Sequence, residues 1–186
     1  MNQTQKTTII TIVLALLLVG AVVGALWGYK KLAGQVDSQG QAPAIKNKGN
    51  YKDFTMIDKD GNERKLSEFV GKPVVINFWA SWCGPCGAEL PHFDKLAKEY
   101  QGKVNFLMVN LTGEDRDSIK RFVSNNGYTF PLYFDKQNSG ARAYSVSSIP
   151  VTVFITADGV VGAQRIGAMS ESVLRSYINQ LLNKEG

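Results

Sequence analysis

The chain has 186 residues, enough for one domain of ordinary size and a short additional segment. Hydrophobic residues make up 44% of it and charged residues 20%, values typical of globular proteins that exclude a mostly disordered chain. Of the net charge of +5, three units come from Lys6, Lys30 and Lys31, so residues 32–186 contain 18 basic and 16 acidic residues. Such a balance argues against a nucleic-acid-binding surface, which needs clustered Lys and Arg.

Residues 9–27 form an apolar run in which Thr11 is the only polar residue. A helix of about 20 residues crosses the ~30 Å hydrocarbon core of a bilayer, and Trp27 lies where an interfacial aromatic residue is expected. We therefore predict a single transmembrane helix, with its short flank, over residues 1–31. The alternative is a cleaved signal peptide, whose apolar region is usually about 7–15 residues long.

Two opposing tendencies bear on the orientation of this anchor. Lys30 and Lys31 follow the apolar run whereas Lys6 precedes it, so the positive-inside rule alone would leave the following domain in the cytoplasm. A short N-terminal anchor before a soluble domain, however, usually exports that domain. We expect a single-pass cell-membrane protein whose soluble domain is extracytoplasmic.

The remainder divides into a tether and a folded domain. Residues 32–50 are rich in Gly, Gln, Ala and Asn without an apolar period, which predicts a flexible linker. Residues 51–186 show the patterns of an α/β domain with a mixed sheet. We expect strands over 54–57, 63–66, 73–78, 104–110, 132–134, 151–155 and 160–166, and helices after the cysteines, over 116–126 and 139–144, and from 170 onward.

Cys83 and Cys86 are the only cysteines, and Gly84 and Pro85 separate them. The pair follows a predicted buried strand and opens a predicted helix, whose unpaired N–H groups and positive dipole end favour a thiolate. Cysteines in such positions have pKa values of about 3.5–7.5, against about 8.5 for a free thiol. We therefore predict that Cys83 is the nucleophile and Cys86, one helical turn further on, the resolving cysteine.

Other uses of the cysteine pair are less compatible with the sequence. A structural zinc site needs four ligands, and His92, six residues after Cys86 on the same helix, would not converge with the pair on one ion. Inert core cysteines would not need Gly-Pro between them. A peroxidatic cysteine would act as one thiol among Thr or Ser and Arg, whereas a partner three residues away favours dithiol exchange. We predict no metal site.

The segment FWASWCGPC, with Ile149-Pro150 far downstream before a strand, resembles thioredoxin. The N-terminal hairpin, the tether and the extra helix–strand unit at 116–134 are similar to the TlpA/ResA branch of membrane-anchored thioredoxins. The resemblance covers about residues 51–182. It implies a thioredoxin fold with an N-terminal β-hairpin and a central helix–strand insertion, thiol–disulfide oxidoreductase activity, and no cofactor.

The resemblance also implies roles for the residues around the cysteines. Trp82 would be the flat apolar neighbour of the active site, and Gly84 and Pro85 would belong to the surface that meets the substrate. Pro150 would be a cis-proline facing the cysteines, and the backbone of Ile149 would pair with the substrate chain in the manner of a strand.

One position departs from thioredoxin. Thioredoxin has a buried Asp before the motif that helps to move the proton of the resolving cysteine, and this chain has Asn77, which cannot titrate. Glu89 lies three residues after Cys86, where TlpA/ResA-type proteins have a titratable glutamate. We predict that Glu89 handles this proton; the alternative is an exposed carboxylate that only stabilises the start of the helix.

The function we expect is reduction of disulfides in partner proteins outside the cytoplasmic membrane. The resemblance implies a membrane electron donor of the CcdA/DsbD kind and substrates such as apocytochrome c thiols, oxidised surface proteins or methionine sulfoxide reductases. We expect a monomer. The alternatives are a disulfide-forming oxidase with the same chemistry, and a non-catalytic binding module whose cysteine pair is structural.

Overall fold

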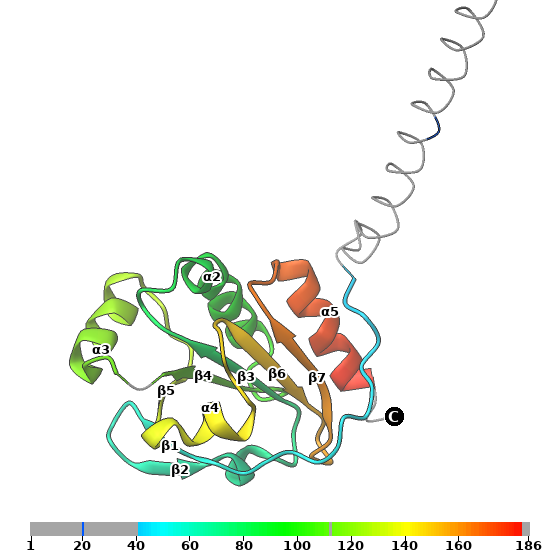
Figure 1. Ribbon diagram of the computed structural model, residues 1–186, viewed down its shortest axis with the longest axis horizontal. Helices are drawn as coiled ribbons and strands as arrows, with labels where there is room; N and C mark the ends of the chain where they lie inside the picture. The colour runs from blue at the N-terminus through cyan, green and yellow to red at the C-terminus, as the bar shows by residue number, and fades with distance from the viewer. Residues whose placement is uncertain (1–19, 21–40, 112, 184–186) are drawn as a thin grey trace, which may run out of the picture. The chain divides into compact units, whose positions relative to one another are not determined.

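The computed structural model describes residues 20, 41–111 and 113–183, and its domain is built on one seven-stranded sheet (Figure 1). Across the sheet the strand order is β2-β1-β5-β4-β3-β6-β7. The strands are β1 (Thr55–Asp58), β2 (Glu63–Lys65), β3 (Val74–Trp79), β4 (Asn105–Asn110), β5 (Leu132–Asp135), β6 (Val151–Ile155) and β7 (Val161–Ile166). The helices are η1 (Leu66–Phe69), α2 (Gly84–Glu99), α3 (Arg116–Asn125), η2 (Lys136–Asn138), α4 (Ser139–Ala143) and α5 (Glu171–Leu182).

The sheet is mixed, as the sequence predicts. Strands β3, β4 and β5 are parallel, whereas β6 and β7 on one side and β1 and β2 on the other are antiparallel to their neighbours. All six residues of β3 are buried. Because both faces of a central strand are covered, its sequence is continuously apolar apart from Asn77 and does not alternate.

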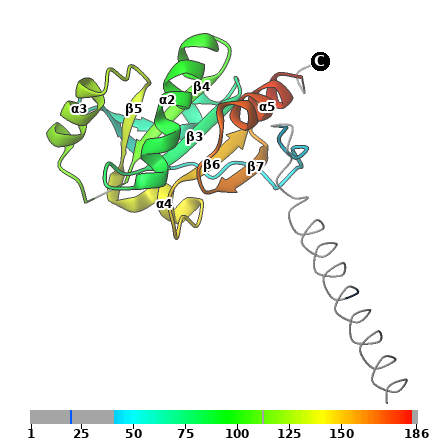
Figure 2. The ribbon, with the colours of Figure 1, turned by 90° about the horizontal axis from the view of Figure 1, so that it is seen from above.

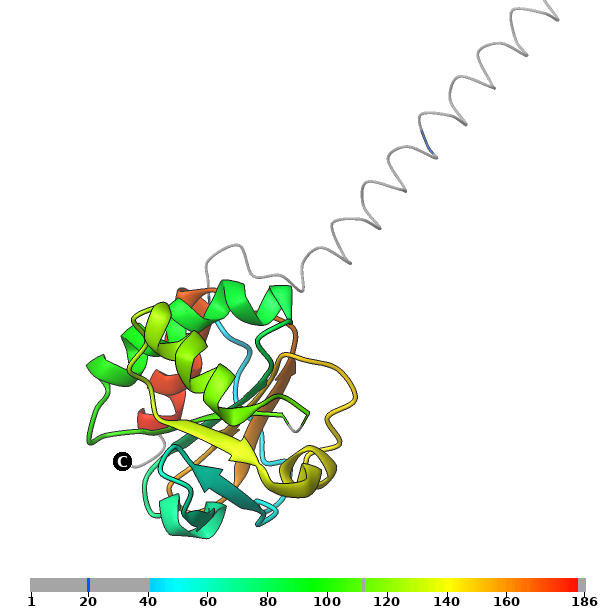
Figure 3. The ribbon, with the colours of Figure 1, turned by 90° about the vertical axis from the view of Figure 1, so that its left-hand side faces the viewer.

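Helices cover both faces of the sheet (Figures 2 and 3). On one face, the apolar side chains of α2, α3 and α5 form a core with inward-facing residues of the strands. On the opposite face, η1 and the end of α4 pack on a second core that contains Phe54, Phe78 and Tyr144. This arrangement, with the β1–β2 hairpin and the added α3–β5 unit, is the thioredoxin-like fold that the sequence predicts.

The first hairpin is confirmed, but its second strand ends before Leu66. Leu66 is fully buried and begins η1 instead. The Glu68 carboxylate accepts a hydrogen bond from the Lys65 backbone N–H at 2.7 Å, which caps the start of this short helix. The turn from strand to helix directs Leu66 into the core.

Residues 41–50, which belong to the predicted linker, are attached to the domain. Lys46 and Lys48 donate backbone hydrogen bonds to Gly162 and Val161, and Ile45 is only 8% exposed. Ile45 packs against Gly162, where an added Cβ would lie 3.2 Å from the Ile45 Cβ. The linker composition had suggested flexibility, whereas one apolar side chain and an edge of β7 hold this segment in place.

The predicted anchor at residues 1–31 lies outside the described residues, apart from Gly20, and so do residues 32–40. Within the part of the chain that is described, every helix is too short or too polar to cross a membrane.

Candidate active site

The cysteine pair lies in the loop that leads from β3 into α2. Cys83 is the N-cap residue of α2, and its Sγ accepts a hydrogen bond from the Cys86 backbone N–H at 3.2 Å. Pro85 occupies the first turn, where a missing N–H costs no helical hydrogen bond. The two sulfur atoms form a disulfide of 2.05 Å, so the site is in its oxidised form. A sulfur at this helix end meets the N–H groups that stabilise it as a thiolate after reduction.

The two cysteines differ in access. Cys83 is 6% exposed and Cys86 is completely buried. The neighbouring Trp82 is 73% exposed, and Gly84 and Pro85 are also exposed. A partner disulfide can therefore approach the side of the pair on which Cys83 lies, as the predicted roles of nucleophile and resolving cysteine require.

The Ile149–Pro150 peptide bond is cis, as the family resemblance implied. These residues directly precede β6, whose Val151 is paired with Phe78 of β3. The end of β3 that continues into the cysteine loop therefore lies beside Ile149 and Pro150. Strand pairing thus brings a segment more than 60 residues downstream to the active site.

Glu89 is completely buried, which excludes the alternative of an exposed carboxylate on the surface of α2. One oxygen accepts a hydrogen bond from Asn77 Nδ2 at 2.8 Å, and the other accepts one from the Met169 backbone N–H at 3.0 Å. Burial raises the pKa of this carboxyl group from 4.5 to about 7, although the two donors partly oppose the rise. A carboxyl group with this pKa exchanges protons near neutral pH, one helical turn after Cys86.

Thr152 and Met169 belong to this site, although the sequence analysis did not identify them. Asn77 Nδ2 also donates a hydrogen bond to Thr152 Oγ1 at 3.0 Å, which joins β3 to β6 beneath α2. Met169 supplies a backbone group, so its side-chain type gave no signal. Thr152 is the only polar residue in the predicted strand 151–155, a signal that could have been noticed.

Glu114 also supports the active-site loop without having been predicted. Its carboxylate accepts hydrogen bonds from the Ser81 backbone N–H at 2.9 Å, from the Ser81 hydroxyl group and from Asn110 Nδ2 at 2.8 Å. Ser81 directly precedes Trp82. The segment between β4 and α3 therefore fixes the loop that carries the exposed tryptophan and the nucleophile.

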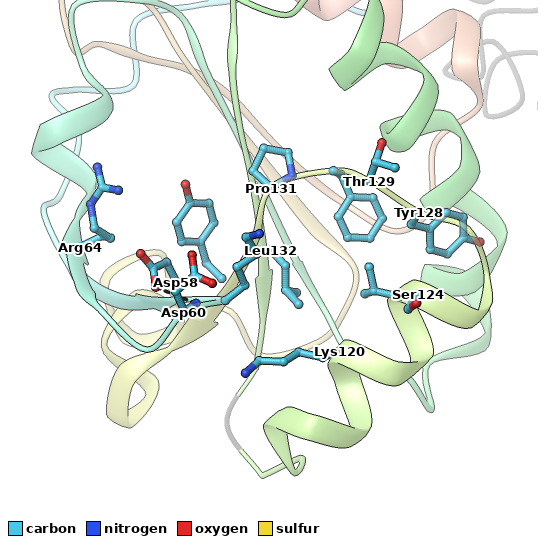
Figure 4. Close-up of a pocket in the computed structure, with 13 residues that line it drawn as sticks. Asp58, Asp60, Arg64, Lys120, Ser124, Tyr128, Thr129, Pro131 and Leu132 are labelled. Carbon is cyan, nitrogen blue, oxygen red and sulfur yellow. Dashed lines mark hydrogen bonds between the residues drawn. The ribbon is translucent and has the colours of Figure 1, made fainter.

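A cleft of about 760 Å³ between the β1–β2 turn and α3 contains none of the predicted site residues (Figure 4). The cleft is lined by the first residues of β5, whereas the cysteines follow the last residues of β3. The two strands are parallel and are separated by β4, so the cleft and the cysteines lie at opposite ends of the sheet. Its charged lining residues have both signs: acidic Asp58 and Asp60, and basic Lys59, Arg64 and Lys120. Because acidic and basic side chains are interspersed, we assign no ligand to this cleft.

Comparison with known proteins matches residues 48–164, more than half of the chain, to the AhpC/TSA family. The thiol-disulfide oxidoreductase ResA of Geobacillus thermodenitrificans strain NG80-2 is 32% identical over 184 residues, which cover 97% of this chain and 99% of that protein. ResA of Bacillus subtilis strain 168 is 34% identical over 127 residues, 68% of this chain and 70% of that protein.

A solved structure extends the comparison to the fold. The exposed lipoprotein thioredoxin Etrx1 of Streptococcus pneumoniae strain TIGR4 superimposes with a TM-score of 0.62 at 29% identity, over 69% of this chain and 99% of that one. A redox-active cysteine pair at the start of α2, a thioredoxin-like fold and these relatives lead to one assignment. The chain belongs to the AhpC/TSA family of thioredoxin-like proteins and, within it, to the ResA-like thiol–disulfide oxidoreductases.

Proposed function

We propose that the protein is a membrane-tethered, extracytoplasmic reductase of disulfides in partner proteins. The observation that carries this proposal is the combination of a nearly buried Cys83–Cys86 disulfide with the fully buried Glu89 one turn further along α2. Once reduced, the cysteine pair can supply two electrons to a substrate disulfide, and Glu89, whose pKa is about 7, can exchange a proton near neutral pH.

The reaction begins from the reduced pair. The Cys83 thiolate attacks one sulfur of the substrate disulfide, forming a mixed disulfide and releasing the other substrate sulfur as a thiolate that takes up a proton. The Cys86 thiol then loses its proton to the Glu89 carboxylate and attacks Cys83 Sγ. The bond between Cys83 and the substrate breaks, and the second substrate sulfur leaves as a thiolate that takes up a proton from water or from Glu89. The substrate is then a dithiol, and the protein is left with the disulfide seen in the structure.

The direction of electron flow rests on Gly84 and Pro85, the dipeptide of thioredoxin, which favours reduction. Equilibration with a glutathione redox buffer tests this direction. We expect a potential below that of the glutathione pool, so that the pair is mostly oxidised at equilibrium with it. A pair that stays reduced in a mostly oxidised buffer would instead make the protein a disulfide-forming oxidase.

A reductase outside the cytoplasm must be recharged through the membrane, and we propose a donor of the CcdA/DsbD kind. The predicted anchor and the alignment with a ResA protein over nearly its whole length support a tethered location. A membrane-impermeant thiol reagent applied to intact cells after mild reduction tests it, because Cys83 and Cys86 are the only thiols of the chain. Labelling only after lysis would contradict an extracytoplasmic domain.

The function itself is tested with the Cys86→Ser variant. Without the resolving thiol, the mixed disulfide on Cys83 persists, so partner proteins remain attached and can be identified after non-reducing electrophoresis. The Cys83→Ser variant is the matched control and should trap none. If Cys86→Ser traps no protein from cells that contain the substrates, protein disulfide exchange is contradicted.

A further inference from the structure

The backbone of Met169 is held on both sides by residues of α2. Its N–H donates to Glu89 Oε2 at 3.0 Å, and its carbonyl oxygen lies 3.1 Å from His92 Nδ1. A carbonyl oxygen only accepts, so Nδ1 carries the hydrogen in this contact. Glu89 and His92 are three residues apart and therefore lie on the same side of the helix.

The position of Met169 in the chain makes this double contact informative. Met169 lies in the loop between β7 and α5, its side chain is buried, and the following residue, Ser170, caps α5 by accepting a hydrogen bond from the Val173 N–H. The N–H that reaches Glu89 is thus supplied by a loop, and loops hold their backbone direction only where other contacts fix it. Among the described residues, His92 provides the side-chain contact to the Met169 carbonyl group.

We propose that His92 is a positioning residue for Glu89. By holding the Met169 carbonyl group, His92 fixes the Met169 backbone and keeps its N–H directed at the Glu89 carboxylate. This proposal rests on the proposed role of Glu89 as the proton acceptor. It adds that the His92 contact helps to set the proton affinity of the Glu89 carboxylate. The Met169 donor stabilises the charged carboxylate against the effect of burial. Loss of the His92 contact therefore weakens this donor and makes Glu89 hold its proton to higher pH.

The other titratable groups around Glu89 are few. β3 and β6, which lie beneath α2, contribute none. On α2, Cys86 is in the disulfide, and Lys95 is paired with Glu171 of α5 at 2.9 Å. Glu171 also pairs with Arg175, while Tyr177 packs against Phe154. In the described part of the chain, the hydrogen bonds from Asn77 and Met169 are therefore the contacts that lower the pKa of Glu89.

The direct test measures the titration of the Glu89 carboxyl carbon by carbon-13 NMR in the full-length, oxidised protein in detergent, with Glu89→Gln to identify the signal. Replacing His92 by Leu removes the donor, and replacing it by Gln moves the donor towards the place of Nε2. Both variants should shift the midpoint upward by about half to one pH unit. His92→Asn keeps a donor near the place of Nδ1 and should restore the midpoint to within a few tenths of a unit.

Lys95→Met is the matched control, because it removes an ion pair between α2 and α5, Lys95–Glu171, and leaves both contacts of the Met169 backbone in place. We expect its midpoint to equal that of the wild type. An unchanged midpoint in both His92→Leu and His92→Gln, or an equal shift in Lys95→Met, would overturn the proposal.

A parallel measurement separates this inference from the proposed function. The pH profile of disulfide exchange should shift with the NMR midpoint in His92→Leu and should not respond to His92→Leu in a Glu89→Gln background. If the NMR midpoint moves and the exchange profile does not, His92 positions Glu89 as proposed, but Glu89 is not the proton acceptor of the reaction.

Discussion

At the scale of single residues, we expect the pKa of Glu89 to set how disulfide exchange responds to pH. Burial raises this pKa to about 7, so the carboxylate form that accepts a proton becomes predominant as the pH rises through about 7. The rate at which Cys86 resolves a mixed disulfide should therefore rise with pH through about 7 in the wild type. In Glu89→Gln this rise should be absent or displaced towards the pKa of the thiol itself. Stopped-flow measurement of mixed-disulfide release from pH 5 to 9 decides between these profiles, and identical profiles would remove Glu89 from the proton route.

The same carboxyl group links stability to pH. Between pH 4.5 and about 7 the folded protein keeps a proton on Glu89 that the unfolded chain has lost. The contribution is complete below about pH 4.5 and is lost as the pH rises through 7, by roughly 3 kcal/mol at most. Denaturant unfolding of the wild type and Glu89→Gln at pH 5 and pH 8 measures it. The wild type should lose stability relative to the variant at pH 8, and a constant difference would contradict the raised pKa.

At the scale of elements, α4 lies very close to Phe54, the residue before β1. A Cβ added to Gly140 of α4 would lie 2.6 Å from a ring carbon of Phe54, and a rigid ring cannot easily yield. We expect Gly140→Ala to destabilise the protein by about 1–3 kcal/mol, as overpacking usually does.

Gly87, an exposed residue of α2, is the matched control for this substitution. No atom of the described residues lies within 4 Å of a Cβ added there, so Gly87→Ala should leave stability unchanged or raise it by up to about 1 kcal/mol. Urea unfolding of both variants measures the sign of the change in the free energy of unfolding for each. Equal effects would mean that backbone entropy, and not the ring of Phe54, decides the outcome at Gly140.

The elements themselves were largely predictable from the sequence, because each depends on a local pattern. The period of apolar residues identified the strands and helices of the domain. The helix start at Cys83 followed from the Cys-Gly-Pro-Cys motif alone. The end of β2 was misplaced because an apolar residue at position 66 fits both a strand and a short helix. Only the packing of Leu66 in the core decides between the two.

The surroundings of Glu89 were not predictable in the same way. Its contacts come from β3, the loop after β7 and, through Asn77, from β6, so they depend on how distant segments meet. Met169 takes part through its backbone, which has no sequence signature. The resemblance to tethered thioredoxins indicated a titratable glutamate, but only the structure shows that it is buried and which groups donate to it.

At the scale of the whole molecule, the folded domain includes residues 41–50, whereas the sequence pattern places its start at residue 51. A chain that begins at residue 51 would lose the contacts of Ile45, Lys46 and Lys48, whereas one that begins at residue 41 keeps them. We expect the shorter chain to be less stable by at least about 2 kcal/mol, from lost hydrogen bonds and burial. Their denaturant midpoints provide the comparison, and coincident midpoints would make residues 41–50 a dispensable linker.

The attachment of residues 46–50 to β7 affects how readily the sheet can pair with the strands of other polypeptide chains. Sheets aggregate through their open edges, and here the start of β7 is occupied by the protein's own chain. At the other edge, β2 has only three residues, Glu-Arg-Lys, all polar or charged. If the proposed substrates include partly unfolded chains with unpaired strands, this arrangement would protect the protein when it meets them. Such chains find little edge on which to add a strand, so an encounter is more readily limited to sulfur exchange than extended into a joint aggregate.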